Sequence, residues 1–188
     1  MATTDLSAAV VPSATFRKQV EKACGQKVTA CFQCEKCTNG CPVTFAMDMA
    51  PHKLVRSVHL GLKDKVLSSD TIWVCASCET CTARCPNGID IASLMDALRQ
   101  IAQAEGVKAA QKNVPLLHSA FLSSMKSHGR VHEAEMTVKY TLKSAGLSGL
   151  LKQANTGLAM LKKGKLKLVP PRVRGGRQVK KLFNEVDA

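Results

Sequence analysis

Apolar residues in the first half of the chain recur every three or four positions, which is the spacing of one face of an α-helix. The first such stretch follows Ser13, a residue type that caps helix N-termini, and stops at Gly25, a residue type that ends helices. Pro51 suits the first turn of another helix. The three apolar faces are Phe16, Val20 and Cys24; Leu54, Val55, Val58 and Leu62; and Ile91, Leu94, Met95, Leu98 and Ile101. This pattern predicts an all-α fold.

Three further helices are predicted in the second half. The first runs from Pro115 to about His128 and ends at Gly129, and Gly146 separates the other two. Their apolar residues are Val131, Val138 and Leu142, and then Leu147, Leu150, Leu151, Ala154, Leu158 and Leu161. A helix with such a face must bury it against something. The first half of the chain and a partner subunit are both open as the covering surface.

Two runs of twelve residues repeat one cysteine pattern. CFQCEKCTNGCP occupies residues 31–42 and CASCETCTARCP occupies residues 75–86, and each reads Cys-x2-Cys-x2-Cys-x3-Cys-Pro. The cysteines match at an offset of 44, and residues 47–50 match residues 89–92 at an offset of 42. The chain therefore contains two repeated arms, each made of a cysteine run and the helix after it. We expect Asp48 and Asp90 to cap those helices.

The cysteine spacing is the one that bacterial-type ferredoxins use to hold [4Fe–4S] clusters. Three cysteines at three-residue intervals can curl around one cluster, and the fourth, after a longer step, points away toward a second cluster. We therefore expect two [4Fe–4S] clusters that exchange their fourth ligands. The expected ligands are Cys31, Cys34, Cys37 and Cys85 at the first cluster, and Cys75, Cys78, Cys81 and Cys41 at the second.

Other uses of the cysteines fit the pattern less well. Zinc ribbons need four ligands, usually in two separated pairs, whereas each run here has four cysteines and a following proline. A disulfide framework is disfavoured because no secretory signal precedes the runs. The ninth cysteine, Cys24, is expected to be a small buried hydrophobic residue rather than a ligand, with a spare thiol beside a cluster as the alternative.

Charge divides the chain into two parts. Residues 1–110 hold 12 Lys/Arg and 10 Asp/Glu, whereas residues 111–188 hold 15 and 4. Residues 162–181 contain nine Lys/Arg and no acid, and Pro170-Pro171 and Gly175-Gly176 are expected to prevent a helix there. Aromatic residues that could stack on bases are missing from this segment, which disfavours nucleic acid as its partner. We expect a basic tail that lies on an acidic partner subunit, with a solvated tail as the alternative.

These observations give a domain plan and a location. Residues 1–110 are expected to form the two-cluster domain, residues 111–161 a helical extension, and residues 162–188 the basic tail. The sequence has no apolar run long enough to span a membrane and no basic region before its first apolar patch, so we expect a cytoplasmic protein.

The two arms, separated by 33 residues that read as helix, resemble an α-helical ferredoxin domain, the type also found in succinate dehydrogenase iron–sulfur subunits. With the helical extension, Phe121, Gly129-Arg130-Val131, Glu133 and the basic ending, the chain resembles the C subunit of heterodisulfide reductase from about Cys31 to about Phe183. The sequence has no Cys-Cys pair and no Gly-x-Gly-x-x-Gly fingerprint, features of the catalytic and flavin-binding subunits of that family.

This resemblance implies an electron relay without catalytic residues of its own. It would pass electrons from a flavin- and iron–sulfur-bearing A subunit to a disulfide-reducing B subunit. Two other functions stay open: an iron–sulfur relay that docks on a membrane quinone or cytochrome b oxidoreductase, and a metal-stabilised nucleic-acid-binding protein.

Overall fold

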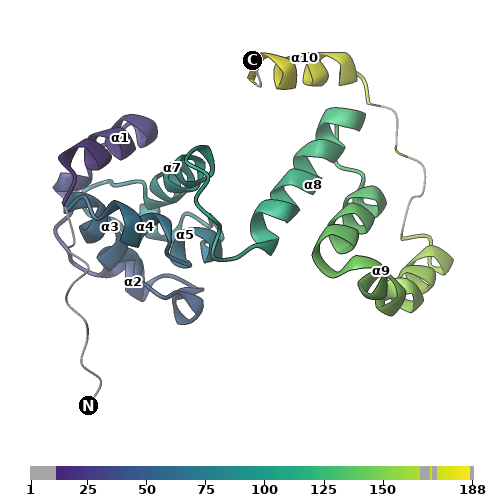
Figure 1. Cartoon of the computed structure of the whole chain (residues 1–188), viewed down its shortest axis with the longest axis horizontal. Helices are drawn as coiled ribbons and strands as arrows, with labels where there is room; N and C mark the ends of the chain where they lie inside the picture. Colours follow the sequence, from purple (N-terminus) through teal and green to yellow (C-terminus); the bar gives the residue numbers. More distant parts are fainter. Residues whose placement is uncertain (1–11, 166–169, 171–172, 187–188) are drawn as a thin grey trace. The chain divides into compact units, whose positions relative to one another are not determined.

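A computed structural model describes residues 12–165, 170 and 173–186. They belong to two compact units, one that ends at Gln111 and one that begins at Lys112 (Figure 1). Every regular element among the described residues is helical, which confirms the predicted all-α fold. The first unit contains α1 (Ala14–Cys24), η1 (Val28–Ala30), α2 (Lys36–Asn39), η2 (Thr44–Ala46), α3 (Pro51–His59), α4 (Lys63–Leu67), α5 (Thr71–Val74), α6 (Thr80–Arg84) and α7 (Ile91–Ala104). The second contains α8 (Asn113–His128), α9 (Glu133–Lys162) and α10 (Gly176–Val186).

Helix α1 has the ends that the sequence predicts. The Ser13 hydroxyl oxygen accepts a hydrogen bond from the Phe16 N–H at 3.2 Å, and Gly25 follows with a φ of 69°. The start of α1 lies against the end of α3, where the Ser13 N–H donates to the Gly61 carbonyl at 3.0 Å. A β-carbon on Gly61, whose φ is +73°, would lie 2.3 Å from the Ser13 carbonyl oxygen, so this junction requires glycine.

The predicted apolar faces of α1, α3 and α7 contribute buried residues to the core of the first unit, where α1 packs against both α3 and α7. Leu54, Leu94 and Leu98 are completely buried, and each such side chain contributes about 1.5–3 kcal/mol through the area removed from water. Leu62 is an exception to the predicted face, because α3 ends at His59 and the chain turns at Gly61. The core lies behind the two cysteine runs and holds the helices that follow them.

The two aspartates of the repeat have different roles. Asp90 caps α7, since its Oδ1 accepts a hydrogen bond from the Ser93 N–H at 2.9 Å. The prediction that Asp48 caps α3 is wrong, because the N-cap of that helix is Ala50, two residues later. Asp48 Oδ1 instead accepts from the N–H of Thr71 at 3.0 Å and from its hydroxyl at 2.8 Å, at the start of α5. It therefore joins two segments that are distant in sequence.

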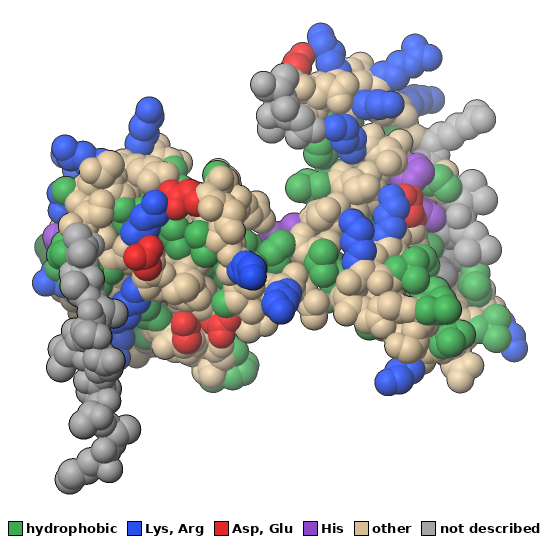
Figure 2. All heavy atoms as spheres, in the orientation of Figure 1, with side chains coloured by type: hydrophobic (Ala, Val, Ile, Leu, Met, Phe, Trp, Pro, Cys, Tyr) green, Lys and Arg blue, Asp and Glu red, His purple; other side chains and the backbone are tan. Residues whose placement is uncertain are grey.

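The second unit has little buried apolar surface among its described residues. Gly129 ends α8 with a φ of 75°, and Gly146 interrupts α9 with φ 65° and ψ −163°, as the sequence predicts. Leu147, Leu151 and Leu158 on the second part of α9 are 67%, 68% and 54% exposed. Apolar and basic side chains are both visible on this unit in Figure 2.

The basic tail contains a helix that was not expected. The prediction that its glycines prevent a helix is wrong, because α10 begins at Gly176 and packs against α8. Gly175 precedes the helix and Gly176 is its first residue, so neither interrupts it, and the residues after them contain neither glycine nor proline. Leu166, Leu168 and Val169 of the basic tail lie outside the described residues. No helix in the described part of the chain has the length and apolar character to cross a bilayer.

Candidate metal centres

The eight cysteines of the two runs line two separate cavities in the first unit. The first cavity is lined by Cys31, Cys34 and Cys37 of the first run and by Cys85 of the second. The second cavity is lined by Cys75, Cys78, Cys81 and Cys41. Each cavity thus contains three cysteines of one run and the last cysteine of the other, in the same grouping that the spacing suggests. The two cavities are of similar size, with about 380 and 370 Å³ of space including their open mouths.

The backbone takes the same unusual path around the second cysteine of each run. Gln33 and Glu35 flank Cys34 with φ of 58° and 64°, and Ser77 and Glu79 flank Cys78 with φ of 49° and 58°. Left-handed backbone at a residue other than glycine costs on the order of 1–3 kcal/mol and is found mainly at functional sites. Alternation of this kind forms concave nests of N–H groups that bind anions, including iron–sulfur clusters.

These four left-handed residues could not be identified from residue type, because glutamine, glutamate and serine do not favour this conformation. The signal available in the sequence was the identical spacing of the cysteines in the two runs, which requires identical turns. The outermost cysteine of each turn, Cys34 or Cys78, is exposed, whereas Cys37 is buried. Each cavity therefore reaches the surface at the second cysteine of its run.

Several polar groups lie beside the cysteine sulfur atoms. Gln33 and Thr80, which lie between the cysteines of the two runs, have such contacts, and the backbone of Ile89 adds another. The Gln33 Nε2 donates to Cys31 at 3.1 Å and the Ile89 N–H donates to Cys85 at 3.3 Å, whereas the Cys78 thiol donates to Thr80 Oγ1 at 3.5 Å. Hydrogen bonds donated to sulfur stabilise negative charge on it.

The cysteine thiols differ in pKa according to their burial. Burial raises the pKa of Cys37 and Cys81, against hydrogen bonds from the threonine that follows each of them. Burial also raises the pKa of Cys75, opposed by a backbone hydrogen bond from Ser77 and by the positive charge of Arg99. Metal ligation requires deprotonated thiols, so occupation of either cavity would release protons.

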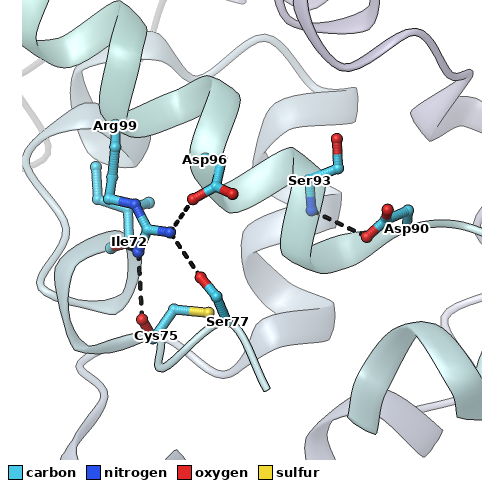
Figure 3. A network of polar contacts seen from close by, with 7 residues as sticks. All are labelled: Ile72, Cys75, Ser77, Asp90, Ser93, Asp96 and Arg99. Atoms are coloured by element: carbon cyan, nitrogen blue, oxygen red, sulfur yellow. Dashed lines mark hydrogen bonds and ion pairs between the residues drawn. The ribbon is translucent and has the colours of Figure 1, made fainter. Parts of the chain in front are cut away.

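The two cavities have different polar residues behind them. Beside the first, the Thr38 hydroxyl lies 2.8 Å from His52 Nδ1, and His52 Nε2 lies 3.4 Å from a Glu35 carboxylate oxygen. Behind the second run, the guanidinium of Arg99 reaches from α7 to the backbone and side chains around Cys75 (Figure 3). The sequence singled out neither His52 nor Arg99, since only the tertiary fold brings them to the runs.

Cys24 lies apart from both cavities. It is half-buried at the end of α1, and its sulfur lies 3.9 Å from the carbonyl oxygens of Glu21 and Gln26. The expected full burial of this residue is therefore only partly met. Within the described part of the chain, no three His, Cys, Asp or Glu side chains are arranged to hold a single metal ion.

Comparisons with known proteins agree with this geometry. Residues 30–90 match the 4Fe–4S dicluster domain family. Over 82 residues the chain is 39% identical to the iron–sulfur C subunit of CoB–CoM heterodisulfide reductase from Methanopyrus kandleri, a match that covers 44% of this chain and 43% of that protein. It is 42% identical over 81 residues to the second such C subunit (C 2) of Methanocaldococcus jannaschii, covering 43% of each. It is 32% identical over 94 residues to the C subunit of H2:CoB–CoM heterodisulfide,ferredoxin reductase from Methanothermobacter marburgensis, covering 50% and 51%.

The comparisons confirm the resemblance to the heterodisulfide reductase C subunits within the matched segment. A dicluster domain implies two [4Fe–4S] clusters, and the thiolate-rich lining of the two cavities fits them. The chain matches about half the length of these curated relatives. The wider resemblance to about Phe183 stays a prediction.

Proposed function

We propose that this chain is an electron-transfer subunit that relays single electrons through two [4Fe–4S] clusters. The observation that carries the proposal is the pair of four-cysteine cavities within a segment that matches a dicluster domain. When bound, each cluster supplies reversible one-electron chemistry. No substrate pocket or catalytic residue is part of the proposal.

The proposed ligands are those of the exchanged arrangement. Cys31, Cys34, Cys37 and Cys85 would hold the first cluster, and Cys75, Cys78, Cys81 and Cys41 the second. The composition of the two cavity linings supports this assignment. Exchange of the fourth ligand would connect the two arms, so that each arm helps to hold both clusters.

The residues around the cavities would tune and expose the clusters. The Gln33 amide and the Ile89 N–H donate toward sulfur, which stabilises added negative charge. The exposed Cys34 and Cys78 mark the edge of each cavity that a redox partner could approach. The apolar residues behind the runs restrict access of water from the core side.

The proposed partners come from the resemblance and the relatives' names. The chain would act in a cytoplasmic heterodisulfide-reductase-like complex, between a flavin- and iron–sulfur-bearing A subunit and a disulfide-reducing B subunit. The excess of basic residues after residue 110 supports docking on an acidic partner surface. The alternative proposal is a relay that docks on a membrane quinone or cytochrome b oxidoreductase.

Metal and redox analysis of the full chain tests the relay. Anaerobically purified protein should contain about eight iron atoms and eight acid-labile sulfides, and reduction should give two reversible electron paramagnetic resonance signals. Stoichiometric zinc without a visible chromophore would overturn the proposal and favour a metal-stabilised binding protein. Isolation of the native complex would then identify its partners, and recovery in the membrane fraction with a cytochrome b would favour the alternative relay.

Deletion of residues 162–188 tests the docking role of the basic tail. Both clusters should remain, whereas assembly with the partner subunit should weaken at moderate salt, because the deletion removes nine clustered positive charges and α10. A chain with Arg177, Lys180 and Lys181 all replaced by Gln is the matched control, since it keeps the helix and removes only charge. Unchanged assembly of both variants would show that the tail does not dock.

A further inference from the structure

Arg99 is a buried arginine whose contacts converge on the second cysteine run. It lies in the middle of α7 and is only 8% exposed. Its Nη1 donates to the carbonyl oxygens of Ile72 at 2.9 Å and Cys75 at 3.2 Å, and its Nη2 donates to the Ser77 hydroxyl at 2.9 Å. Nη2 also pairs with the Asp96 carboxylate, one turn earlier on α7 (Figure 3).

Two of these contacts fall on the backbone turn that shapes the second cavity. Cys75 lines that cavity, and Ser77 is one of the left-handed residues that flank Cys78. The guanidinium therefore places a fixed positive charge directly behind the ligand-bearing loop. Arginine keeps its charge at any physiological pH, so this charge is permanent. Its carboxylate partner, Asp96, is 54% exposed and can be screened by water, whereas Arg99 cannot.

The first arm has no equivalent charge at the corresponding position. When Asp48 is aligned with Asp90, the residue that corresponds to Arg99 is Ser57 on α3. Ser57 is buried, and its hydroxyl donates to the Met49 sulfur at 3.6 Å. Each cavity is lined by four cysteines, three from one run and one from the other, but the two cavities differ in the permanent charge supplied by the helix behind them.

We propose that Arg99 is a positioning residue that raises the reduction potential of the second cluster above that of the first. The proposal rests on the two-cluster assignment given above. Reduction adds one negative charge to a site, and a positive charge held in a poorly hydrated environment stabilises the reduced form more than the oxidised form. At equilibrium, a single electron supplied by a chemical reductant such as dithionite would reside mainly on the second cluster.

A purely structural role is the competing explanation, because Arg99 also satisfies carbonyl groups at the C-terminal end of α5. The two roles differ in what they predict for charge. If the role of Arg99 is only structural, it depends on the hydrogen bonds of the guanidinium, and the sign of the charge on neighbouring residues has no effect on the reduction potential. An electrostatic role depends on net charge, so removal of the arginine and removal of its carboxylate partner must act in opposite directions.

Redox titration of the full holoprotein, followed by electron paramagnetic resonance, separates the two roles. Arg99→Gln removes the positive charge and keeps a hydrogen-bond donor. Arg99→Lys keeps the positive charge but loses the planar guanidinium group that donates through both Nη1 and Nη2. Asp96→Asn removes the opposing negative charge. Arg56→Met, which removes an exposed arginine from α3, is the control for loss of one positive charge from the unit.

The expected result is a shift in one midpoint potential only. Arg99→Gln should lower the more positive potential enough to change the electron distribution at least tenfold, which is about 59 mV for one electron. Asp96→Asn should raise it by a smaller amount, and Arg99→Lys should retain most of the wild-type value. Arg56→Met should leave both potentials unchanged. The shift caused by Arg99→Gln should persist when the substitution is made in a Cys34→Ala chain, which keeps the second cluster. It should disappear in a Cys78→Ala chain, which loses that cluster.

Four outcomes would overturn the proposal. They are unchanged potentials in Arg99→Gln, shifts of the same sign in Arg99→Gln and Asp96→Asn, equal shifts in the Lys and Gln variants, or an equal shift in Arg56→Met. If Arg99→Gln fails to fold, the sign of the Asp96→Asn shift decides. Iron and sulfide content is measured on every sample. A wild-type chain without eight iron atoms refutes the two-cluster function itself, whereas eight iron atoms with insensitive potentials refute only the role of Arg99.

Discussion

Just before the last cysteine of each run, the first arm has Gly40 and the second has Arg84. The two residues touch, and a β-carbon on Gly40 would lie 2.6 Å from Cδ of Arg84. A side chain at position 40 would have to displace the Arg84 side chain, beside the contact between α2 and α6. In this chain the two arms therefore differ at their line of contact, with glycine on one side and arginine on the other.

Away from that contact, the arms share their backbone and differ in their surroundings. Both have left-handed turns on either side of the second cysteine, and both end their following helix at a glycine with positive φ. The first arm places His52 beside its cavity and the second places Arg99 behind its run. The shared cysteine spacing thus gives the two sites the same backbone shape, whereas the helix behind each run determines the charge near the site.

Paired cysteine substitutions should have the largest effect, and the effect is on the iron content of the protein. Cys41→Ala should retain about four of eight iron atoms, because it removes a ligand from one cluster only. Adding Cys81→Ala should cause no further loss, whereas adding Cys37→Ala should remove nearly all iron. Iron and sulfide assays of anaerobically purified protein measure both effects. The reverse result, with the same-run pair retaining four iron atoms, would show that the arms do not exchange ligands.

The glycines that end α3 and α7 offer a matched test of packing. Gly61→Ala should destabilise the protein by about 3 kcal/mol or more, because alanine adds both left-handed strain and a clash with the Ser13 backbone. Gly106→Ala should cost only about 1 kcal/mol, since its φ is +68° but nothing lies within 4 Å of an added β-carbon. Urea midpoints of the anaerobic holoproteins give the order, and equal losses would contradict the close approach at Gly61.

Substitution of the two repeated aspartates should cause a smaller difference in the free energy of unfolding. Asp48→Ala should cost about 2 kcal/mol because it leaves the N–H of buried Thr71 with a poorer partner, whereas Asp90→Ala should cost about 1 kcal/mol as the loss of a helix cap. Burial acts to raise the pKa of Asp48, but hydrogen bonds from Ser69 and Thr71 outweigh it, so the pKa lies below its ordinary value of 3.8.

Because the pKa of Asp48 is lowered, its contribution to the free energy of unfolding should not change between pH 5 and pH 8. The contribution of Asp48 is fully present above the unfolded-state pKa and is lost as the pH falls through the lower folded-state pKa. Unfolding of Asp48→Ala and wild-type protein at pH 5 and pH 8 should therefore give the same difference. A difference that shrinks at pH 5 would mean that the carboxylate is not held ionised by these hydrogen bonds.

The smallest effect is expected from relief of backbone strain. Glu79→Gly should stabilise the protein by about 0.5 kcal/mol, because glycine adopts the left-handed conformation freely but also gains freedom in the unfolded chain. Glu35→Gly should gain less, since it also loses the ion pair with His52. Urea midpoints at pH 6 test the order, and strong destabilisation by Glu79→Gly would show a further role for its carboxylate.

The features that the sequence predicted correctly are local in the chain. The caps at Ser13, Gly25 and Gly129 act on the nearest helical turn, and the break at Gly146 needs no distant partner. The cysteine runs were informative for a similar reason, because their spacing encodes a turn. The grouping of the cysteines in two cavities matches the expected ligand sets, whose assignment to clusters stays a prediction.

The features that the sequence missed depend on contacts between distant segments. Asp48 was expected to cap the next helix, but Thr71 competes for it from 23 residues away. Helix α10 exists where glycine and proline suggested none, and its packing on α8 supplies what local propensity lacks. Arg99 reads as one polar residue on an amphipathic helix until the fold brings it to Ser77.

The exchanged lining of the cavities has a consequence for ancestry. A chain with one arm would surround its own cavity with three cysteines and direct the fourth elsewhere. Two such chains could complete each other only as a homodimer, by the reciprocal exchange that domain-swapped proteins use. Duplication and fusion of the gene would turn that dimer into a single polypeptide. Its two halves could then acquire different amino-acid substitutions. Gly40 facing Arg84, and Ser57 in the place of Arg99, are the differences that a fused dimer can accumulate and a symmetric one cannot.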